Sequence, residues 1–566
     1  MNALNVITTK TNTYDAIVIG SGMSGGWAAK ELTEKGMQTL VLEAGRPIVP
    51  EKDYVDHLPV WDVKFRGMRD RKYENVYQQV QRHIGDEWNS KFFVNDLENP
   101  YTTAPDQPYL FLRGRHLGGR SVMWGRQTYR WSDLDFEANL KDGHGVDWPI
   151  RYKDIEPWYD YVEDFIGVSG QAEGLPQLPD GKFLPPMEFN CAEMVVRDAV
   201  AKKFPDRRVT IGRTAILTQN HRGRFACHYC GPCDHGCITR SYFSSIHSTL
   251  PAAEATGKLT LRHFSVVHSL IYDSGTRRVT GVRVIDGETK QAMEFRAKVI
   301  FLCASTLESA RILLHSATPE FSNGLANSSG EVGHNLMDHI MHGGATGIIP
   351  GHEDRVQIGN RPNGIYVPRF RNVHDKHPGF VRGYGFQGGA GRDDWGRGSE
   401  MAGFGADFKH KLKTPGPWRF SFGGFGECLP NHENKLELNA DQVDAWGIPT
   451  IKISHKWREN ELALVKDMPV TAAEMLEAAG AKEIHTFAEP SIPGEGIHEM
   501  GSARMGRDPK TSVLNQYNQA HDIPNLFVTD GSFMVSSACQ NPSLTYMAMT
   551  ARACDYAVNQ MKKGEL

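Results

Sequence analysis

The sequence predicts an α/β protein in which a Rossmann-like nucleotide-binding domain is interrupted by a second, inserted domain. Three observations predict this. A strand–turn–helix–strand pattern spans residues 15–44. A second strand–helix unit stands near the other end, over residues 525–531 and onward from Pro542. The segment between them, about 345–489, has a different texture of short strands and glycine-rich, aromatic stretches. Units of one type at both ends imply one discontinuous domain.

Length and composition set the outer limits. The 566 residues are enough for two or more domains and a large core. A net charge of -4 and a pI near 6.6 argue against a nucleic-acid partner. No apolar run is long enough to span a bilayer. The first thirteen residues are polar and lack an apolar segment behind a basic one, so no export signal is expected there.

The first motif is a glycine-rich turn, Gly20-Ser21-Gly22-Met23-Ser24-Gly25, directly after an apolar strand. The first glycine allows the tight turn, the second lets the backbone approach a pyrophosphate, and the third lets the helix pack on the strand. Glu43 ends the next apolar run, about where a ribose-binding carboxylate is expected. Together they predict a bound flavin or nicotinamide dinucleotide.

The remaining elements follow from periodicity. A second glycine turn, Gly118-Gly119, sits in a basic cluster over residues 113–125, where glycines permit close approach of a ligand. Apolar periodicity predicts helices and strands as follows: helices over 28–35, 192–203, 307–315 and 474–479, and strands over 39–43, 259–262, 279–285, 299–302, 419–425 and 435–438. The stretch 383–405 is expected to form strands and loops on the substrate side.

Four of the nine cysteines stand close together, as Cys227, Cys230, Cys233 and Cys237. Their C-x2-C-x2-C-x3-C spacing is the bacterial ferredoxin run, except that Ile238 replaces the usual proline. Thiolates at this spacing suit an iron–sulfur cluster or zinc. The tetrapeptide from Cys230 to Cys233 would also suit a disulfide redox site. The other five cysteines are expected to pack in the core: Cys191, Cys303, Cys428, Cys539 and Cys554.

Taken together, the motifs resemble those of the glucose–methanol–choline (GMC) oxidoreductases. They occur in family order from about Asp15 to Val558: the glycine loop, the Gly118-Gly119 turn, the segment 333–339, and a C-terminal block over 497–506 and 541–545. The resemblance implies FAD and an alcohol or sugar hydroxyl as hydride donor. It also implies an FAD-binding domain like that of p-hydroxybenzoate hydroxylase, and an inserted α+β substrate domain built on an antiparallel sheet.

The resemblance assigns residues to roles. His498 is implied as the catalytic base and Asn541 as its partner. Residues 1–50, 105–150, 225–345 and 495–566 would form the FAD-binding domain, with 227–237 as an insert. Residues 51–104, 151–224 and 346–494 would form the substrate-binding domain and connecting segments. The implied FAD contacts are Gly20, Ser21, Gly22, Ser24, Gly25, Glu43, Ala44, Arg46, Gly118, Gly119, Ser121, Trp124, Val267, Ala304, Asp530, Gly531, Asn541, Pro542 and Thr545.

Two further expectations concern neighbours of this site. Pyranose oxidases carry a histidine, bonded to the flavin, where Met123 stands, so FAD is expected to be non-covalent. Pro542 is expected in the first turn of the last helix, where proline is favoured. His334, His339 and His342 form a local cluster that we expect to make hydrogen bonds at a domain boundary rather than to line the pocket.

Within the family, the cysteine insert is similar to that of bacterial multi-subunit sugar dehydrogenases, which carry a three-iron cluster in a similar position. The sequence thus favours a [3Fe-4S] or [4Fe-4S] cluster, and a glucoside 3-dehydrogenase activity. Alternatives are a gluconate 2-dehydrogenase-like or other polyol dehydrogenase subunit, a pyranose oxidase-like enzyme, a hydroxynitrile lyase and a purely electron-transferring subunit.

The same resemblance implies partners: a small subunit with an export signal, and a cytochrome c or other electron acceptor. The protein would then be periplasmic through co-export, or else cytoplasmic.

Overall fold

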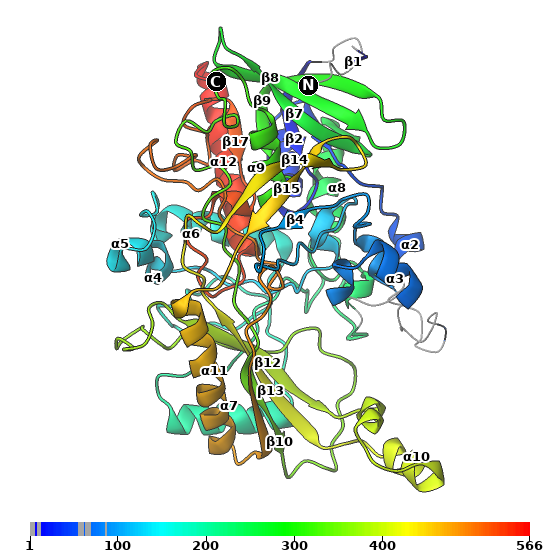
Figure 1. The fold of residues 1–566 in the computed structure, drawn as a ribbon. Coiled ribbons are helices and arrows are strands. Elements are labelled where there is room, and N and C mark those ends of the chain that lie inside the picture. The colour runs from blue at the N-terminus through cyan, green and yellow to red at the C-terminus, as the bar shows by residue number, and fades with distance from the viewer. Residues whose placement is uncertain (1–5, 8–12, 55–61, 63–69, 85–87, 232) are drawn as a thin grey trace.

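The computed structural model describes residues 6–7, 13–54, 62, 70–84, 88–231 and 233–566. Residues 1–5 and 8–12, on which the expectation about an export signal rests, lie outside the described residues, as does Pro232 between two of the clustered cysteines. The molecule is elongated, with one large sheet in the upper half of Figure 1 and a second sheet in the lower half. The C-terminus lies at the top.

The upper sheet has eight strands in the order β6-β3-β2-β9-β8-β7, with β1 and β17 also paired to β9. Its strands are β1 (Val6–Ile7), β2 (Thr13–Ile19), β3 (Thr39–Leu42), β6 (Leu259–Arg262), β7 (Ser265–Asp273), β8 (Arg278–Asp286), β9 (Ala292–Leu302) and β17 (Leu526–Val528). Pairing is parallel from β6 through β9 and at β17, and antiparallel across β9, β8 and β7. Strands from both ends of the chain therefore share one sheet, as predicted.

Helices from distant parts of the chain cover this sheet. They are α1 (Met23–Glu34), α6 (Tyr152–Ile166), α8 (Thr249–Ala255), α9 (Thr306–His315) and α12 (Ser543–Lys563). Trp27 of α1 meets Tyr161 and Phe165 of α6 edge-on. Helix α6 thus packs on this layer, although the predicted boundary at residue 150 assigns it to the other set of segments. The predicted domain limits stay a prediction.

The lower sheet is antiparallel throughout, in the order β16-β10-β13-β12-β11-β5. Its strands are β5 (Thr210–Ile211), β10 (Gly343–Ile349), β11 (Ile365–Val367), β12 (Tyr384–Arg392), β13 (Trp418–Gly426) and β16 (Lys482–Ala488). Helices α7 (Cys191–Lys203) and α11 (Glu459–Ala478) lie against it (Figure 1). This confirms the inserted domain built on an antiparallel sheet.

Helix α11 is much longer than the stretch 474–479 that the sequence predicts. Pro469 stands inside it and interrupts the helical pattern, because proline lacks the amide that continues a helix. Burial of Val465, Met468 and Met475 against the lower sheet holds the helix together across that position. Tertiary packing here outweighs the local signal.

A small third sheet, β14-β15-β4, lies between the two larger ones in Figure 1. Its strands are β4 (Thr102–Thr103), β14 (Lys435–Val443) and β15 (Pro449–Ser454). The shorter helices are α2 (Pro50–Asp53), α3 (Arg71–Tyr77), α4 (Asp133–Phe136), α5 (Ala138–Asp142) and α10 (Gly405–Lys413). Among the residues that the structure describes, no helix combines the length and apolar character needed to cross a membrane.

The β2–α1 turn is closely packed against backbone. Gly20 has a φ of +98°, and a Cβ there would meet the carbonyl oxygen of Cys303 at 2.4 Å. A Cβ on Gly25 would meet the carbonyl oxygen of Gly20 at 2.0 Å. These are the turn and helix-packing roles predicted for the two glycines.

Gly25→Ala should therefore destabilise the protein and weaken FAD binding. Because the clash is with backbone, relief requires the helix to move, and overpacking of this kind costs about 1–3 kcal/mol or more. Gly391→Ala in β12 is the control, since a Cβ there has nothing within 4 Å. Thermal unfolding and FAD content are the measurements. Equal melting temperatures for the two variants would contradict the packing role.

Candidate active site

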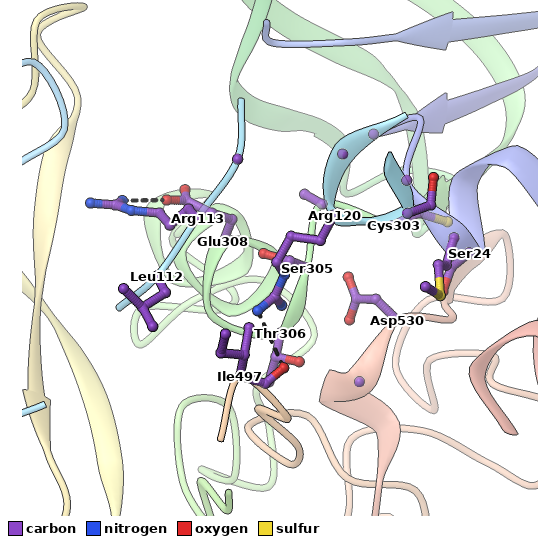
Figure 2. Close-up of a pocket in the computed structure, with 18 of the residues that line it drawn as sticks. Ser24, Leu112, Arg113, Arg120, Cys303, Ser305, Thr306, Glu308, Ile497 and Asp530 are labelled. Atoms are coloured by element: carbon purple, nitrogen blue, oxygen red, sulfur yellow. Dashed lines mark hydrogen bonds and ion pairs between the residues drawn. The ribbon is translucent and has the colours of Figure 1, made fainter. Parts of the chain in front are cut away.

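A cavity of about 510 Å³ lies where loops of the upper sheet face the lower sheet. Its wall takes residues from the β2–α1 turn, the 113–127 segment, the β9–α9 loop, the 495–498 loop and the start of α12. Gln387 of β12 and Phe425 of β13 reach it from the lower sheet. Figure 2 shows Arg120 extending toward Thr306 and Ile497, with Asp530 and Ser24 across the cavity. The cavity therefore joins the two halves of the molecule.

The glycine turn opens one end of this cavity. A Cβ on Gly22 would have no neighbour closer than the Gly118 carbonyl oxygen at 4.0 Å, so the backbone is exposed to a ligand. The carboxylate of Glu43 accepts hydrogen bonds from the Ser21 hydroxyl and from the Gly45 amide at 2.8 Å. Burial raises the pKa of this carboxyl group. Both features suit a dinucleotide with its ribose at Glu43.

Unpartnered polar atoms support the same use of the cavity. Several wall residues carry a buried nitrogen with no hydrogen-bond partner among the described residues: Arg113, Arg115, His116 and Arg126. Buried polar groups are normally paired, so unpaired ones at a cavity wall point to a polar ligand. Arg113 itself forms an ion pair with Glu308 at 3.2 Å (Figure 2). The wall fits a large, polar, anionic cofactor such as FAD.

Most of the predicted FAD contacts lie in the cavity wall. They are Gly20, Ser21, Gly22, Ser24, Glu43, Ala44, Gly119, Ser121, Trp124, Val267, Ala304, Asp530, Gly531, Asn541 and Pro542. Asp530 accepts hydrogen bonds from the Ser309 hydroxyl and the Ser532 amide, and burial raises its pKa.

Four predicted contacts do not line the cavity, and each has a structural partner instead. Arg46 is turned toward Asp53, at 2.9 Å. The buried Thr545 hydroxyl meets that of Tyr159 at 2.8 Å. Gly25 and Gly118 pack against other protein atoms at the two glycine turns, on the side away from the cavity. Pro542 is the N-cap of α12, one residue before the helix starts, rather than part of its first turn.

His498 and Asn541, predicted as a pair, do meet in the cavity. The Asn541 side-chain nitrogen lies 3.2 Å from Nε2 of His498. The Asn541 oxygen accepts a hydrogen bond from Nε2 of Gln387 at 2.7 Å. Removal from bulk water lowers the pKa of His498 well below its usual value, and nearby His339 and Arg120 lower it further. The low pKa therefore keeps the imidazole neutral, with one N–H and one basic nitrogen.

Two carboxylates hold the loop that carries His498. Asp338 is fully buried and accepts backbone hydrogen bonds from Gly494, Gly496 and His498, at 2.9 to 3.0 Å. Burial and the charge of Glu499 raise the pKa of Asp338 to about 7. The carboxylate of Glu499 accepts hydrogen bonds from both terminal nitrogens of Arg120, at 3.1 and 2.7 Å. The loop is thus tied to the Gly118-Gly119 turn.

Sequence reasoning missed two of these contributors, Asp338 and Gln387, and it predicted His339 only as a hydrogen-bonding residue at a domain boundary. His339 does not line the cavity. Its Nδ1 lies 2.9 Å from Nδ1 of His498, so its role is more specific than a hydrogen bond at a domain boundary. Its neighbour Asp338 lay in the same 333–339 motif, which was the available signal. Gln387 had none, because its place depends on how the lower sheet packs.

The four clustered cysteines border one small second cavity, of about 10 Å³. Backbone amides of Tyr229 and Ser241 donate to the sulfurs of Cys227 and Cys237, at 3.4 and 3.3 Å. Burial raises the thiol pKa of Cys227, and that of Cys233 to about 12. Among the described residues, no two cysteines are joined by a disulfide. Within the described part of the chain, no group of three or more metal-ligating side chains is arranged to hold a metal.

Comparison with known proteins agrees with the architecture. Over 97% of its length, the chain is 29% identical to a 2-methyl-1,2-propanediol dehydrogenase from Mycolicibacterium austroafricanum, of which 96% is covered. It is 24% identical to the fructose dehydrogenase large subunit of Gluconobacter japonicus, with 99% and 100% of the two chains covered. Among solved structures, a variant of formate oxidase from Aspergillus oryzae RIB40 superposes with a TM-score of 0.62 at 14% identity, covering 99% of this chain and all of that one.

Family models provide the more decisive comparison. Two models, both described as GMC oxidoreductase, match residues 14–341 and 430–550. The first alone covers more than half of the chain, and it contains the glycine turn, Glu43 and the 333–339 segment. The second contains His498 and Asn541. The chain belongs to the GMC oxidoreductases, a family of FAD-dependent enzymes.

Proposed function

We propose that the protein is an FAD-dependent dehydrogenase that oxidises a secondary hydroxyl of a sugar or glycoside, with C3 of a glucoside as the favoured position. The observation that carries this proposal is the His498–Asn541 pair, 3.2 Å apart in the cavity that the glycine turn opens. Bound FAD, held by the glycine turn, Glu43 and the start of α12, supplies the acceptor for the hydride that leaves the carbinol carbon.

The protein's own residues handle the hydroxyl. Nε2 of His498 takes the proton as the O–H bond breaks, so that a neutral carbonyl forms when the C–H bond is lost. The Asn541 amide donates a hydrogen bond to the substrate oxygen and, being neutral, does not compete for the proton. The low pKa keeps the His498 ring neutral before the reaction, so that one ring nitrogen is free to accept the proton.

The charges near His498 favour an uncharged substrate. Arg120 is the cation that acts on His498, and its guanidinium is bound to Glu499 by two hydrogen bonds. Arg113 and Arg311 both pair with Glu308. A substrate carboxylate would have to displace Glu499 to pair with Arg120, the cation that acts on His498. At the position of the reacting hydroxyl, this supports a neutral sugar or glycoside over a gluconate-type substrate.

The acceptor is proposed to be a protein or dye rather than oxygen, with electrons leaving through an iron–sulfur cluster. What supports a cluster is the set of donors, since four thiols border one void and two of the sulfurs already receive amide hydrogen bonds. Because these thiols are not arranged to hold a metal in the part of the chain that the structure describes, the sulfurs would have to close around the cluster as it is inserted. Zinc and a Cys230–Cys233 disulfide are the competing occupants.

A second candidate substrate is a small diol. It rests on the 29% identity, over nearly the whole chain, to the 2-methyl-1,2-propanediol dehydrogenase. The same His498–Asn541 chemistry would serve, so only substrate preference separates the candidates.

We further propose a multi-subunit enzyme. This proposal rests on the similarity to the fructose dehydrogenase large subunit, which is named as one subunit of a larger enzyme. A small partner would carry the export signal and a cytochrome c would take the electrons, which places the protein in the periplasm. Cell fractionation with co-purification tests this, and a wholly cytoplasmic protein without a partner would exclude it.

FAD is proposed to be non-covalent, since Met123 cannot form the histidyl bond, and acid should release the FAD into the supernatant.

Anaerobic methyl glucoside should bleach the flavin of the wild-type protein, and NMR of the product should identify the oxidised carbon. His498→Ala should slow this reduction by about 10²–10⁴-fold, the typical contribution of a general base, with FAD still bound. His432→Ala is the control, because His432 lies outside the cavity wall. Unchanged reduction in His498→Ala would reject the base. Bleaching by the propanediol but by no sugar would favour the second candidate.

Cys230→Ser should leave flavin reduction by substrate intact but slow electron transfer to a large external acceptor, because it removes one proposed cluster ligand. Cys191→Ser in α7 is the matched control outside the cluster. Iron, sulfide and zinc analysis of the purified protein identifies the occupant. Loss of flavin reduction itself in Cys230→Ser would mean that the cysteines are structural.

A further inference from the structure

His339 is buried beside the proposed catalytic base but outside the cavity wall. Its ring meets that of His498 edge-on, with centroids 4.9 Å apart. The two Nδ1 atoms are 2.9 Å apart. On the far side, Nε2 of His339 lies 3.2 Å from the Ser537 carbonyl oxygen and 3.0 Å from that of Ala538. Every nitrogen of the two rings thus has a close protein neighbour, and the neighbour of Nε2 of His498 is Asn541, which lines the cavity.

The two carbonyls determine where the proton of His339 sits. A carbonyl oxygen can only accept, so Nε2 of His339 must carry the hydrogen. Burial lowers the pKa of His339 to about 4, which leaves the ring neutral with a single N–H. Its Nδ1 is therefore a lone pair, directed at His498.

The tautomer of His498 follows from that lone pair. A 2.9 Å contact between two Nδ1 atoms is a hydrogen bond only if one of them carries hydrogen, so Nδ1 of His498 must be the donor. The other tautomer would place two buried lone pairs against each other. In the neutral ring, Nε2 of His498 is then unprotonated.

The opposite end of the chain of contacts agrees. Gln387 donates to the oxygen of Asn541, which leaves the Asn541 amide hydrogens directed at Nε2 of His498. A donor at this position requires an acceptor on His498. Two independent partners, one on each side, thus require the same tautomer.

We propose that His339 is a positioning residue that holds His498 as its Nδ1–H tautomer and so keeps the basic lone pair on Nε2, facing the cavity. The inference rests on the proposed function, in which His498 is the base. In this role His339 acts through His498 and needs no contact of its own with substrate or cofactor.

The same contact acts after proton transfer. Once Nε2 of His498 has gained the substrate proton, its Nδ1–H bond to His339 becomes charge-assisted and stronger. The proton does not pass beyond His339, because Nε2–H of that ring faces two carbonyl oxygens, which accept hydrogen bonds but do not take up a proton. The charged and titratable groups around the two rings are Asp338, Glu499, Arg120, Glu495 and Cys428. None of these groups is itself changed by a substitution at His339.

Two amide substitutions separate the proposed role from simple space-filling. In His339→Asn, the side-chain oxygen stands as many bonds from Cα as Nδ1 does, and it can accept from His498. In His339→Gln, the amide nitrogen stands where Nε2 does, and it can donate to the two carbonyls while the acceptor toward His498 is lost. The measurement is anaerobic flavin reduction by substrate across pH, normalised to bound FAD.

We expect the Gln variant to be at least roughly tenfold slower than the Asn variant, with KM unchanged, because part of the general-base contribution is lost. Without its acceptor the His498 imidazolium is less stable, so the acidic limb of the pH profile should move to lower pH in Gln but not in Asn. His339→Leu, which makes neither hydrogen bond, should behave like Gln and serves if the Gln variant loses FAD.

The His498→Ala background separates the two levels of the account. A positioning residue acts only through His498, so His339→Gln should cause no further loss there. Equal rates and pH profiles for the Asn and Gln variants, with His498→Ala still slow, would overturn the role of His339 alone. A His498→Ala variant as fast as wild type would instead overturn the proposed function.

Discussion

One direction of hydrogen bonding runs through the site, and the proposed chemistry depends on it. Gln387 donates to Asn541, and Asn541 donates to Nε2 of His498. Nδ1 of His498 donates to His339, which in turn donates to the carbonyls of residues 537–538. Each partner can take only one role, since amide nitrogens donate and carbonyls accept. Within this chain of hydrogen bonds, the nitrogen that can take a proton from a ligand is Nε2 of His498. A base is thus built from neutral groups, because the ring's hydrogen-bond partners among the described residues are His339 and Asn541 rather than a carboxylate.

The fold explains why these groups meet. Gln387 belongs to the lower, inserted sheet, whereas Asn541 precedes α12 of the upper half. The loop of His498 is tied to Asp338 by three amides and to the glycine-rich turn by the Arg120–Glu499 pair. The cavity for FAD and the base are therefore positioned by the same loops. The Gln387–Asn541 hydrogen bond joins the lower sheet to the start of α12 within the site.

Local patterns were sufficient for part of this. The glycine turn and Glu43 carry their function in a short stretch, so the dinucleotide end could be predicted from residues alone. His498 and Asn541 could be selected only through family resemblance, because an isolated histidine has no local signature. His339 and His498 are 159 positions apart, and no periodicity reports that they touch. Helix α11 was shortened in prediction because Pro469 breaks a pattern that burial restores.

The most direct test of the account is the protonation state of the two ring nitrogens of His498. Nitrogen NMR of the FAD-loaded protein with ¹⁵N-labelled histidine, with His498→Gln used to assign the signals by difference, reads each nitrogen separately. The account predicts a protonated Nδ1 and an unprotonated Nε2 in wild-type protein at neutral pH. A protonated Nε2 with a bare Nδ1 would contradict it, because the lone pair would then face His339 instead of the substrate.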